Sequence, residues 1–311
     1  MKALLLGANG QLGQNLAAHP RLASLGEVIL ATRDGQLSNG ASAETADLSR
    51  PESLTAVLDR ISPDVIINAA AYTAVDRAET EEDLATRVNG EAVGVLGQWA
   101  AGRGIPVVHF STDYVFDGEG TRPYLPDDPT SPLGAYGRSK RAGERALQHS
   151  GVAHLIFRTA WVYAPWGHNF LRTMLRLAAD RDELRVVADQ VGAPTTTTLI
   201  ADGAMLALEH WLAADQDTRR GLEGVHHLVA GGETSWHGFA SAIVQQAHER
   251  GILARCPRVT AIGTNEFPTP ARRPRYSVLD ASGFERTFGM LLPSWQQGLD
   301  GVLATLALQR K

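Results

Sequence analysis

The sequence predicts an α/β fold in which a doubly wound parallel sheet is joined to a smaller, irregular α/β substrate lobe. Short apolar runs alternate with longer helical patterns through the first half of the chain. Strands and helices that alternate with short connections form right-handed crossovers and a parallel sheet covered on both faces. After about residue 160 the Pro- and Gly-rich connections lengthen, which indicates the second lobe.

Buried strands are expected at five apolar runs, residues 3–6, 28–31, 65–67, 107–110 and 155–157. Helices are expected at 11–19, 51–60, 81–101, 135–148, 170–179, 199–214 and 239–250, with a last one from about 295. Ser49, three residues before Glu52, predicts a capping box for the second helix, and Pro51 suits its first turn. We expect the first domain over 1–160 and the second lobe over 161–311, with segments of about 184–230 returning to the sheet.

The composition argues against several classes of function. The chain has 311 residues, a formal net charge of −5 and no basic tail, which argues against nucleic acid as the main partner. It contains no run of eighteen apolar residues, so no membrane span is expected. The single Cys256 excludes an internal disulfide and a multi-cysteine metal site, and it favours the reducing cytoplasm as the location.

A glycine-rich turn follows the first strand and opens the first helix. Gly7, Gly10 and Gly13 have the spacing G-x-x-G-x-x-G, which lets backbone N–H groups approach a pyrophosphate at the positive end of the helix dipole. This is not the commoner G-x-G-x-x-G spacing; it is typical of short-chain dehydrogenases. A tight turn that packs helix on strand is the alternative interpretation. Its position after the first strand favours a Rossmann-like dinucleotide-binding domain.

The end of the second strand bears on the choice of dinucleotide. An acid there binds the ribose 2′-hydroxyl of NAD, whereas an Arg accommodates the 2′-phosphate of NADP. Arg33 precedes Asp34, so NADPH is favoured and NADH is left open by the acid. Asp47 and Leu48 are candidates for flanking the adenine. The small residues 69–71 would allow close approach of a nicotinamide ribose, although tight helix–sheet packing explains them equally well.

The sharpest chemical feature is Tyr136 followed four residues later by Lys140. On a helix these side chains share a face. Because a cation lowers the pKa of a nearby tyrosine, Lys140 is expected to make Tyr136 a better acid–base group at neutral pH. Only three of the 29 basic residues are lysines, and with six tyrosines the chance of this spacing is about 2%. The guanidinium of Arg could not readily replace Lys140, because a compact ammonium must also reach a ribose hydroxyl there.

Ser111 and Thr112 end the fourth expected strand. A hydroxyl there can donate a hydrogen bond to a carbonyl oxygen on which charge develops during hydride transfer. Adjacent strand residues point to opposite faces, so one of the two should face the site, and spacing alone leaves open which. The chain contains no phosphate-binding G-x-x-x-x-G-K-[ST] loop, no G-x-S-x-G elbow and no H-E-x-x-H motif.

Together these motifs resemble the extended short-chain dehydrogenase/reductase superfamily. Longer strings narrow the resemblance to the dTDP-4-dehydrorhamnose reductase family, across essentially the whole chain. They are Gly10–Gly13 (GQLG), Asn68–Asp76 (NAAAYTAVD), Ser111–Gly118 (STDYVFDG), Phe157–Tyr163 (FRTAWVY), Asp189–Thr195 (DQVGAPT) and Pro268–Pro274 (PTPARRP).

The resemblance implies a role for individual residues. The catalytic residues would be Thr112, Tyr136 and Lys140, which also selects Thr112 over Ser111. Asn89 is similar to the helix asparagine that supports the proton relay of the superfamily. Cofactor contacts would come from Gly10, Gln11, Leu12, Asp47, Leu48, Ala71, Tyr72, Thr73, Tyr136 and Lys140. Substrate contacts would come from Thr112, Asp113, Trp161 and Arg272, the last suiting a diphosphate.

The resemblance gives little reason to expect magnesium. Some members bind this metal through acidic side chains, whereas the aligned positions here are Asn15 and Thr198, which carry no carboxylate. A metal-bridged dimer is therefore not expected, and a homodimer of another kind stays open.

The activity implied is reduction of a dTDP-4-keto sugar to dTDP-L-rhamnose by NAD(P)H. Two alternatives remain at this point. One is a non-catalytic regulatory subunit similar to the β subunit of methionine adenosyltransferase, against which the intact Thr112, Tyr136 and Lys140 argue. The other is a related nucleotide-sugar epimerase or dehydratase. A dehydratase would usually place a second acid after Asp113, where this chain has Tyr114.

Overall fold

A seven-stranded parallel sheet forms the centre of the larger lobe, in the order β11-β6-β5-β4-β1-β2-β3. The computed structural model describes residues 1–309. The strands are β1 (Lys2–Leu6), β2 (Glu27–Thr32), β3 (Glu44–Thr45), β4 (Val65–Asn68), β5 (Val107–Thr112), β6 (His154–Thr159) and β11 (Gly224–His227). The strand order reverses beside β1, which is the point where open α/β sheets bind their ligands.

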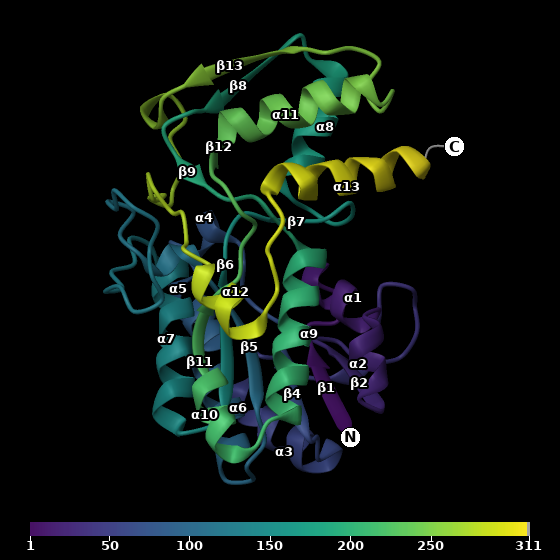
Figure 1. Ribbon diagram of the computed structural model, residues 1–311, viewed down its shortest axis with the longest axis vertical. Coiled ribbons are helices and arrows are strands. Elements are labelled where there is room, and N and C mark those ends of the chain that lie inside the picture. Colours follow the sequence, from purple (N-terminus) through teal and green to yellow (C-terminus); the bar gives the residue numbers. More distant parts are fainter. Residues whose placement is uncertain (310–311) are drawn as a thin grey trace.

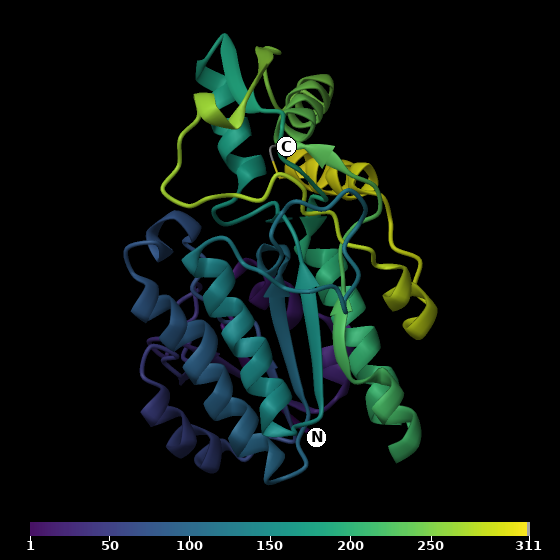
Figure 2. The ribbon, with the colours of Figure 1, turned by 90° about the vertical axis from the view of Figure 1, so that its left-hand side faces the viewer.

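Helices cover both faces of the sheet (Figure 2). Ala3 and Leu5 of β1 pack in one hydrophobic cluster with helices of one face, and Leu4 and Leu6 pack in another, as the two-residue period of a strand requires. The first face is covered by α1 (Gln11–Ala17), α2 (Pro20–Ser24), α9 (Thr197–Ala213) and α12 (Ser282–Phe288). The second is covered by α3 (Pro51–Ile61), α6 (Ala92–Ala101) and α7 (Ala135–Ser150).

The second lobe has its own hydrophobic core and lies beyond the carboxyl ends of the strands (Figure 1). Its core helices are α8 (Phe170–Asp180), α11 (Trp236–Glu249) and α13 (Trp295–Leu308). Three short strand pairs accompany them: β7 (Val162–Tyr163) with β10 (Thr195–Thr196), β9 (Val191–Gly192) with β12 (Thr234–Ser235), and β8 (Glu183–Val187) with β13 (Arg258–Ile262). The remaining helices are α4 (Val75–Ala78), α5 (Glu82–Thr86) and α10 (Gln216–Leu222), with 3₁₀ turns at Asp113–Val115 and Thr264–Glu266.

The predicted α/β fold class is confirmed, and three local differences have physical causes. The helix expected at 81–101 is divided by a π-helical turn, Arg87–Glu91. The predicted Ser49 cap is wrong, because its hydroxyl donates to Asp47 and α3 begins without a side-chain cap. Within the 184–230 segment, 224–227 joins the main sheet as β11, whereas β8 pairs with β13 instead. Among residues 1–309 no helix has the length and apolar character needed to cross a membrane.

Candidate active site

The glycine turn between β1 and α1 packs backbone directly on backbone, with no room for a side chain. Gly7 has a φ of +80°, and a Cβ added to it would lie 2.6 Å from the backbone nitrogen of Ala70. A Cβ on Gly13 would lie 2.1 Å from the Gly7 carbonyl oxygen. The first turn of α1 begins at Gly10 without a side-chain cap. The turn thus keeps free backbone close to the switch point, as a bound pyrophosphate requires.

The loop after β2 is held against this turn by Asn9, which the sequence analysis did not single out. Its side chain donates to the Gln36 carbonyl at 2.8 Å and accepts from the Ser38 backbone N–H at 2.8 Å. Asp34 is exposed and accepts from the Gln36 backbone N–H and the Thr32 hydroxyl, and these hydrogen bonds lower the pKa of its carboxyl group. Arg33 is left exposed at the loop surface.

The other predicted cofactor residues lie around the same edge of the sheet. Leu48 is buried in the core under α3, and Asp47 accepts from Ser49. Leu12 packs against the core on the other face. Ala71 and Thr73 are exposed on the segment after β4, with Tyr72 half-buried between them.

Asn89 fixes the segment after β4 to the start of α7. Its side chain accepts from the Tyr72 N–H at 2.9 Å and donates to the Tyr72 carbonyl at 3.0 Å and to the Ser139 hydroxyl at 2.9 Å. A Cβ on Gly143 would lie 2.1 Å from the Asn89 carbonyl oxygen, so the π turn and α7 pack without an intervening side chain. π turns of this kind are frequent at functional sites.

The two hydroxyls at the end of β5 point to different surroundings. Ser111 donates to Glu144 at 2.5 Å, and Glu144 also receives two hydrogen bonds from Arg158, at 2.9 and 2.8 Å, in a fully buried ion pair. Thr112 instead lies beside Asp113, to which it donates at 3.0 Å. The Ser111 hydroxyl is therefore committed to the core, and Thr112 is the one placed on the side of Tyr136.

Tyr136 is brought to Thr112 by the first turn of α7. Burial raises the pKa of the phenol to about 12, and the Thr112 hydroxyl acts in the opposite direction. The ring of Tyr114 packs edge-on against Tyr136, with centroids 5.6 Å apart. Burial also raises the pKa of the neighbouring Asp113 carboxyl group to about 6, and hydrogen bonds from the Ser277 and Thr112 hydroxyls act in the opposite direction. The Asp113 Oδ2 atom is buried without a hydrogen-bond partner. Because the pKa of Tyr136 lies well above 7, its phenol is protonated at neutral pH and can donate a proton.

Lys140 does not act on Tyr136 as the sequence analysis expected. Its ammonium is buried and donates to the Phe110 carbonyl at 2.6 Å, with His109 Nε2 at 3.3 Å. Burial lowers the pKa of Lys140 to about 8. The expectation that Lys140 lowers the pKa of Tyr136 is wrong for this structure, because the nitrogen is turned toward β5 and burial dominates the titration of the phenol.

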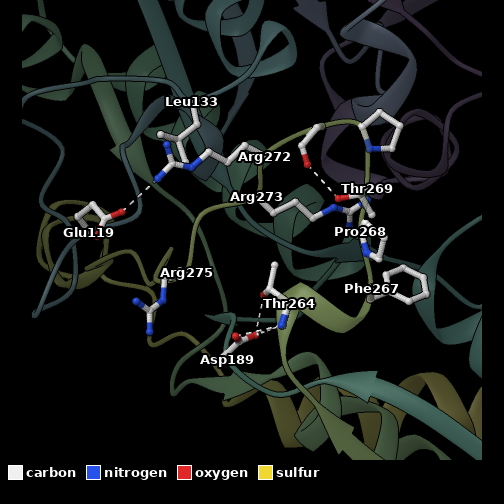
Figure 3. A pocket seen from close by; sticks show the side chains of 12 residues that line it. Glu119, Leu133, Asp189, Thr264, Phe267, Pro268, Thr269, Arg272, Arg273 and Arg275 are labelled. Atoms are coloured by element: carbon white, nitrogen blue, oxygen red, sulfur yellow. Dashed lines mark hydrogen bonds and ion pairs between the residues drawn. The ribbon is translucent and has the colours of Figure 1, made fainter.

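A pocket of about 410 Å³ lies where the second lobe meets the segments after β5. Arg272, Arg273 and Arg275 line it together with Glu119 and Asp189 (Figure 3). Arg272 is mostly exposed and reaches toward Glu119 at 3.7 Å. Thr112, Tyr136 and Lys140 do not line this pocket.

Asp76 of α4, to which the sequence assigned no role, links the lining of the pocket to the segment that follows β4. Its carboxylate accepts from Arg273 at 3.0 Å and from the Ala271 N–H at 3.3 Å. This contact joins the segment after β4 to the arginine-bearing loop of the second lobe.

Trp161 lies between β6 and β7, where the chain passes from one lobe to the other. Its φ of +46° is uncommon for a residue with a large side chain. Its indole stacks on Trp236 with ring centroids 3.5 Å apart, and a Cβ on Gly192 would collide with it. Gln11 also bridges the lobes, because its side chain accepts from Asn169 at 2.6 Å and donates to the His168 carbonyl.

The two positions aligned with acidic metal ligands lie together in the structure. Asn15 donates to the Thr198 hydroxyl at 3.0 Å, so the pair is satisfied by a neutral hydrogen bond. Over residues 1–309 no group of three or more His, Cys, Asp or Glu side chains is arranged to hold a metal ion.

Known proteins similar to this chain share its sequence and its overall fold. The family model described as RmlD substrate binding domain matches residues 1–308. A dTDP-4-dehydrorhamnose reductase of Burkholderia thailandensis is 48% identical over 95% of this chain and 96% of its own length. Solved dTDP-4-dehydrorhamnose reductases from Clostridium acetobutylicum and, in complex with NADP, Bacillus anthracis superpose with TM-scores of 0.83 and 0.82 at 34% and 30% identity. Each comparison covers 98% of this chain and 99% of the other. The chain belongs to the dTDP-4-dehydrorhamnose reductase family.

Proposed function

We propose that this protein reduces dTDP-4-dehydro-β-L-rhamnose to dTDP-L-rhamnose, the last step of dTDP-L-rhamnose synthesis, with NADPH as the hydride donor. The observation that carries the proposal is the convergence of Thr112 and Tyr136 at the carboxyl end of β5, with Lys140 one turn further along α7. Membership of a family of reductases supports it. NADPH is favoured over NADH by Arg33, which is exposed just after β2, where an Arg accommodates a 2′-phosphate.

The residues of the glycine turn fit a dinucleotide. The close backbone packing at Gly7 and Gly13, together with the first turn of α1, which has no side-chain cap, suits a pyrophosphate bound by backbone N–H groups. NADPH, when bound, supplies the hydride for C4 of the sugar. Gln11, Tyr72 and Lys140 are the proposed residues that hold it.

The protein side of the chemistry is proton transfer and charge stabilisation. Tyr136, protonated at neutral pH, donates its proton to the oxygen on C4 as negative charge develops there. The Thr112 hydroxyl donates a hydrogen bond to the same oxygen. In the structure this hydroxyl donates its one hydrogen to Asp113 at 3.0 Å, so we expect it to turn from the carboxylate to the sugar oxygen when the substrate binds.

The substrate is proposed to bind across both lobes. Arg272, Arg273 and Arg275 give the pocket of the second lobe a positive excess that suits a diphosphate. Trp161 and Asp113 are the proposed contacts to the sugar. On this proposal residues 1–160 hold the cofactor and 161–311 mainly the sugar nucleotide, of which 310–311 lie outside the described residues. The exposed thiol of Cys256 suits a reducing compartment, the cytoplasm.

The test is turnover of dTDP-4-dehydro-L-rhamnose, followed as loss of NADPH absorbance, in the wild type and Tyr136→Phe. Loss of the phenolic proton donor should lower kcat by about 10²–10⁴-fold and leave NADPH affinity nearly unchanged. Tyr163→Phe is the matched control, because its hydroxyl is buried without a partner in the second lobe. Equal turnover in Tyr136→Phe, or no turnover in the wild type, would refute the proposal.

A further inference from the structure

Lys140 is the last of three buried polar side chains that lie in a row beneath the site, and the proposed mechanism does not use the other two. Asn68 of β4, His109 of β5 and Lys140 of α7 are each at most 2% exposed. His109 Nδ1 is 3.2 Å from Asn68 Nδ2, and its Nε2 is 3.3 Å from Lys140 Nζ. Each ring nitrogen of His109 therefore has one polar partner, and the hydrogen-bonding role of each partner can be assigned.

The orientation of the Asn68 amide is set by a backbone group. Its Oδ1 lies 3.1 Å from the backbone nitrogen of Ala70. A backbone N–H can only donate, so the atom facing it is the amide oxygen. The amide nitrogen then faces His109 and donates to Nδ1.

This contact decides where the proton of His109 resides. Burial and the charge of Lys140 hold the pKa of His109 well below its usual range, so the ring is neutral and carries one proton. Because Nδ1 accepts from Asn68, the proton is on Nε2. That N–H points at Lys140.

An N–H facing Lys140 distinguishes the two forms of the lysine. The amine form has a lone pair that accepts from His109 Nε2–H while an amine hydrogen goes to the Phe110 carbonyl. The ammonium form has no lone pair, so it would face another donor unless His109 changed tautomer and broke its bond to Asn68. The charge of Lys140 and the tautomer of His109 are therefore coupled.

We propose that Asn68 and His109 are a positioning pair for Lys140, in which Asn68 fixes the proton of His109 on Nε2 and this N–H favours the amine form of the lysine. Its catalytic meaning rests on the proposed function. When Tyr136 has given its proton to the sugar oxygen, it is a phenolate that must regain a proton. The ammonium form of Lys140 can supply that proton and become the amine, and His109 favours this step because its Nε2–H stabilises the amine.

The other charges around Lys140 act differently. Glu144, one turn along α7, favours the ammonium form, but its carboxylate is shared by Arg158 and Arg141 at 2.8 and 3.1 Å. Tyr136 precedes Lys140 by one turn of α7, and Asp113 lies beyond the end of β5. His109 is therefore the titratable side chain that meets Lys140 directly across the interface with β5.

The chain offers a direct experiment, because it contains only three lysines. In protein labelled at lysine, NMR resolves Lys2, Lys140 and Lys311, and the signal that Lys140→Met removes can be followed through a pH titration. In histidine-labelled protein the ¹⁵N shifts report the tautomer of His109, assigned by its loss in His109→Gln. Neither measurement needs substrate or cofactor, so their outcome is independent of whether the proposed reaction is correct.

Two replacements of Asn68 test the coupling. Asn68→Asp offers His109 an acceptor, and Asn68→Leu offers neither donor nor charge. Both should move the His109 proton to Nδ1 and raise the titration midpoint of Lys140 by about one pH unit, a tenfold change in proton affinity. If the added charge alone mattered, only Asn68→Asp would shift the midpoint. His227→Gln, which removes a buried histidine elsewhere in the sheet, is the matched control and should shift nothing.

At a pH above the Lys140 midpoint, where the lysine is in the amine form, an Nδ1–H tautomer in the wild type would overturn the proposal by itself, even if a variant did not fold. It would also be overturned if Asn68→Leu left the Lys140 midpoint where it is in the wild type. An Nε2–H tautomer with the midpoint raised in both variants would support it.

Discussion

Replacing Glu144 with Gln tests the ion pair that holds the end of β5. The Glu144 carboxylate is fully buried and accepts hydrogen bonds from Ser111, Arg141 and, twice, Arg158. Glu144→Gln keeps the shape of the side chain but removes its charge and turns one acceptor into a donor. The guanidinium of Arg158, which is 3% exposed, then remains charged in the core without its counterion.

The size of the effect follows from this burial. Removing one partner of a buried ion pair costs about 3–5 kcal/mol, because the remaining charge is neither solvated nor paired. Glu82 and Arg138 form a matched pair on the surface, with both side chains 45% exposed. Glu82→Gln should cost about 0–1 kcal/mol, as solvent screens that pair.

Urea denaturation, followed by circular dichroism, measures both losses in the free energy of unfolding. The double variant Glu144→Leu with Arg158→Met removes both charges together, and it should recover most of the stability that Glu144→Gln loses. A loss below about 1 kcal/mol for Glu144→Gln, equal to that of Glu82→Gln, would refute the argument that burial makes this pair essential.

Three further outcomes are expected. In Gly13→Ala the new Cβ meets the Gly7 carbonyl at 2.1 Å, so NADPH affinity measured by fluorescence titration should fall more than about tenfold, whereas Gly102→Ala, which has open space, should not change it. Arg33→Ala should weaken NADPH binding by about tenfold and leave NADH binding as it is; equal effects on both would exclude a 2′-phosphate contact. Because the pKa of Asp113 is raised to about 6, the folded state keeps a proton that the unfolded state releases between about pH 4 and 6. The free energy of unfolding should therefore fall by at most about 3 kcal/mol as the pH rises through that window, and urea titrations of Asp113→Asn should lack this fall.

The elements of the sheet could be predicted from the sequence because their signals are local. Apolar runs locate β1, β2, β4, β5 and β6, and the periodic patterns locate the helices that cover them. The π turn at Arg87–Glu91 could not be predicted, because it depends on the close approach of α7 at Gly143. The short strand pairs of the second lobe were missed for a similar reason: two-residue strands exist only through their partners.

In the candidate site, the local spacing of Tyr136 and Lys140 was enough to pair them on one helix. The choice between Ser111 and Thr112 could not be made from spacing, because it depends on Glu144, 33 residues later in the chain. The orientation of the Lys140 side chain could not be predicted either, because it depends on the Phe110 carbonyl and the His109 imidazole of β5. His109 is a polar residue in the middle of a buried strand, and this is the signal in the sequence that could have identified it.

The pairing of β11 with β6 bears on how reductases of this kind can be recombined. β11 comes from a segment that follows α9, and α9 itself covers one face of the sheet. A protein cut after residue 160 would expose the edge of β6 and the apolar face beneath α9, which invites aggregation. A chimera that exchanges residues 161–309 would import the last strand and a covering helix along with the substrate lobe. Such a design must therefore preserve the pairing of β11 with the edge of β6, and not only the covalent connection between the lobes at Trp161.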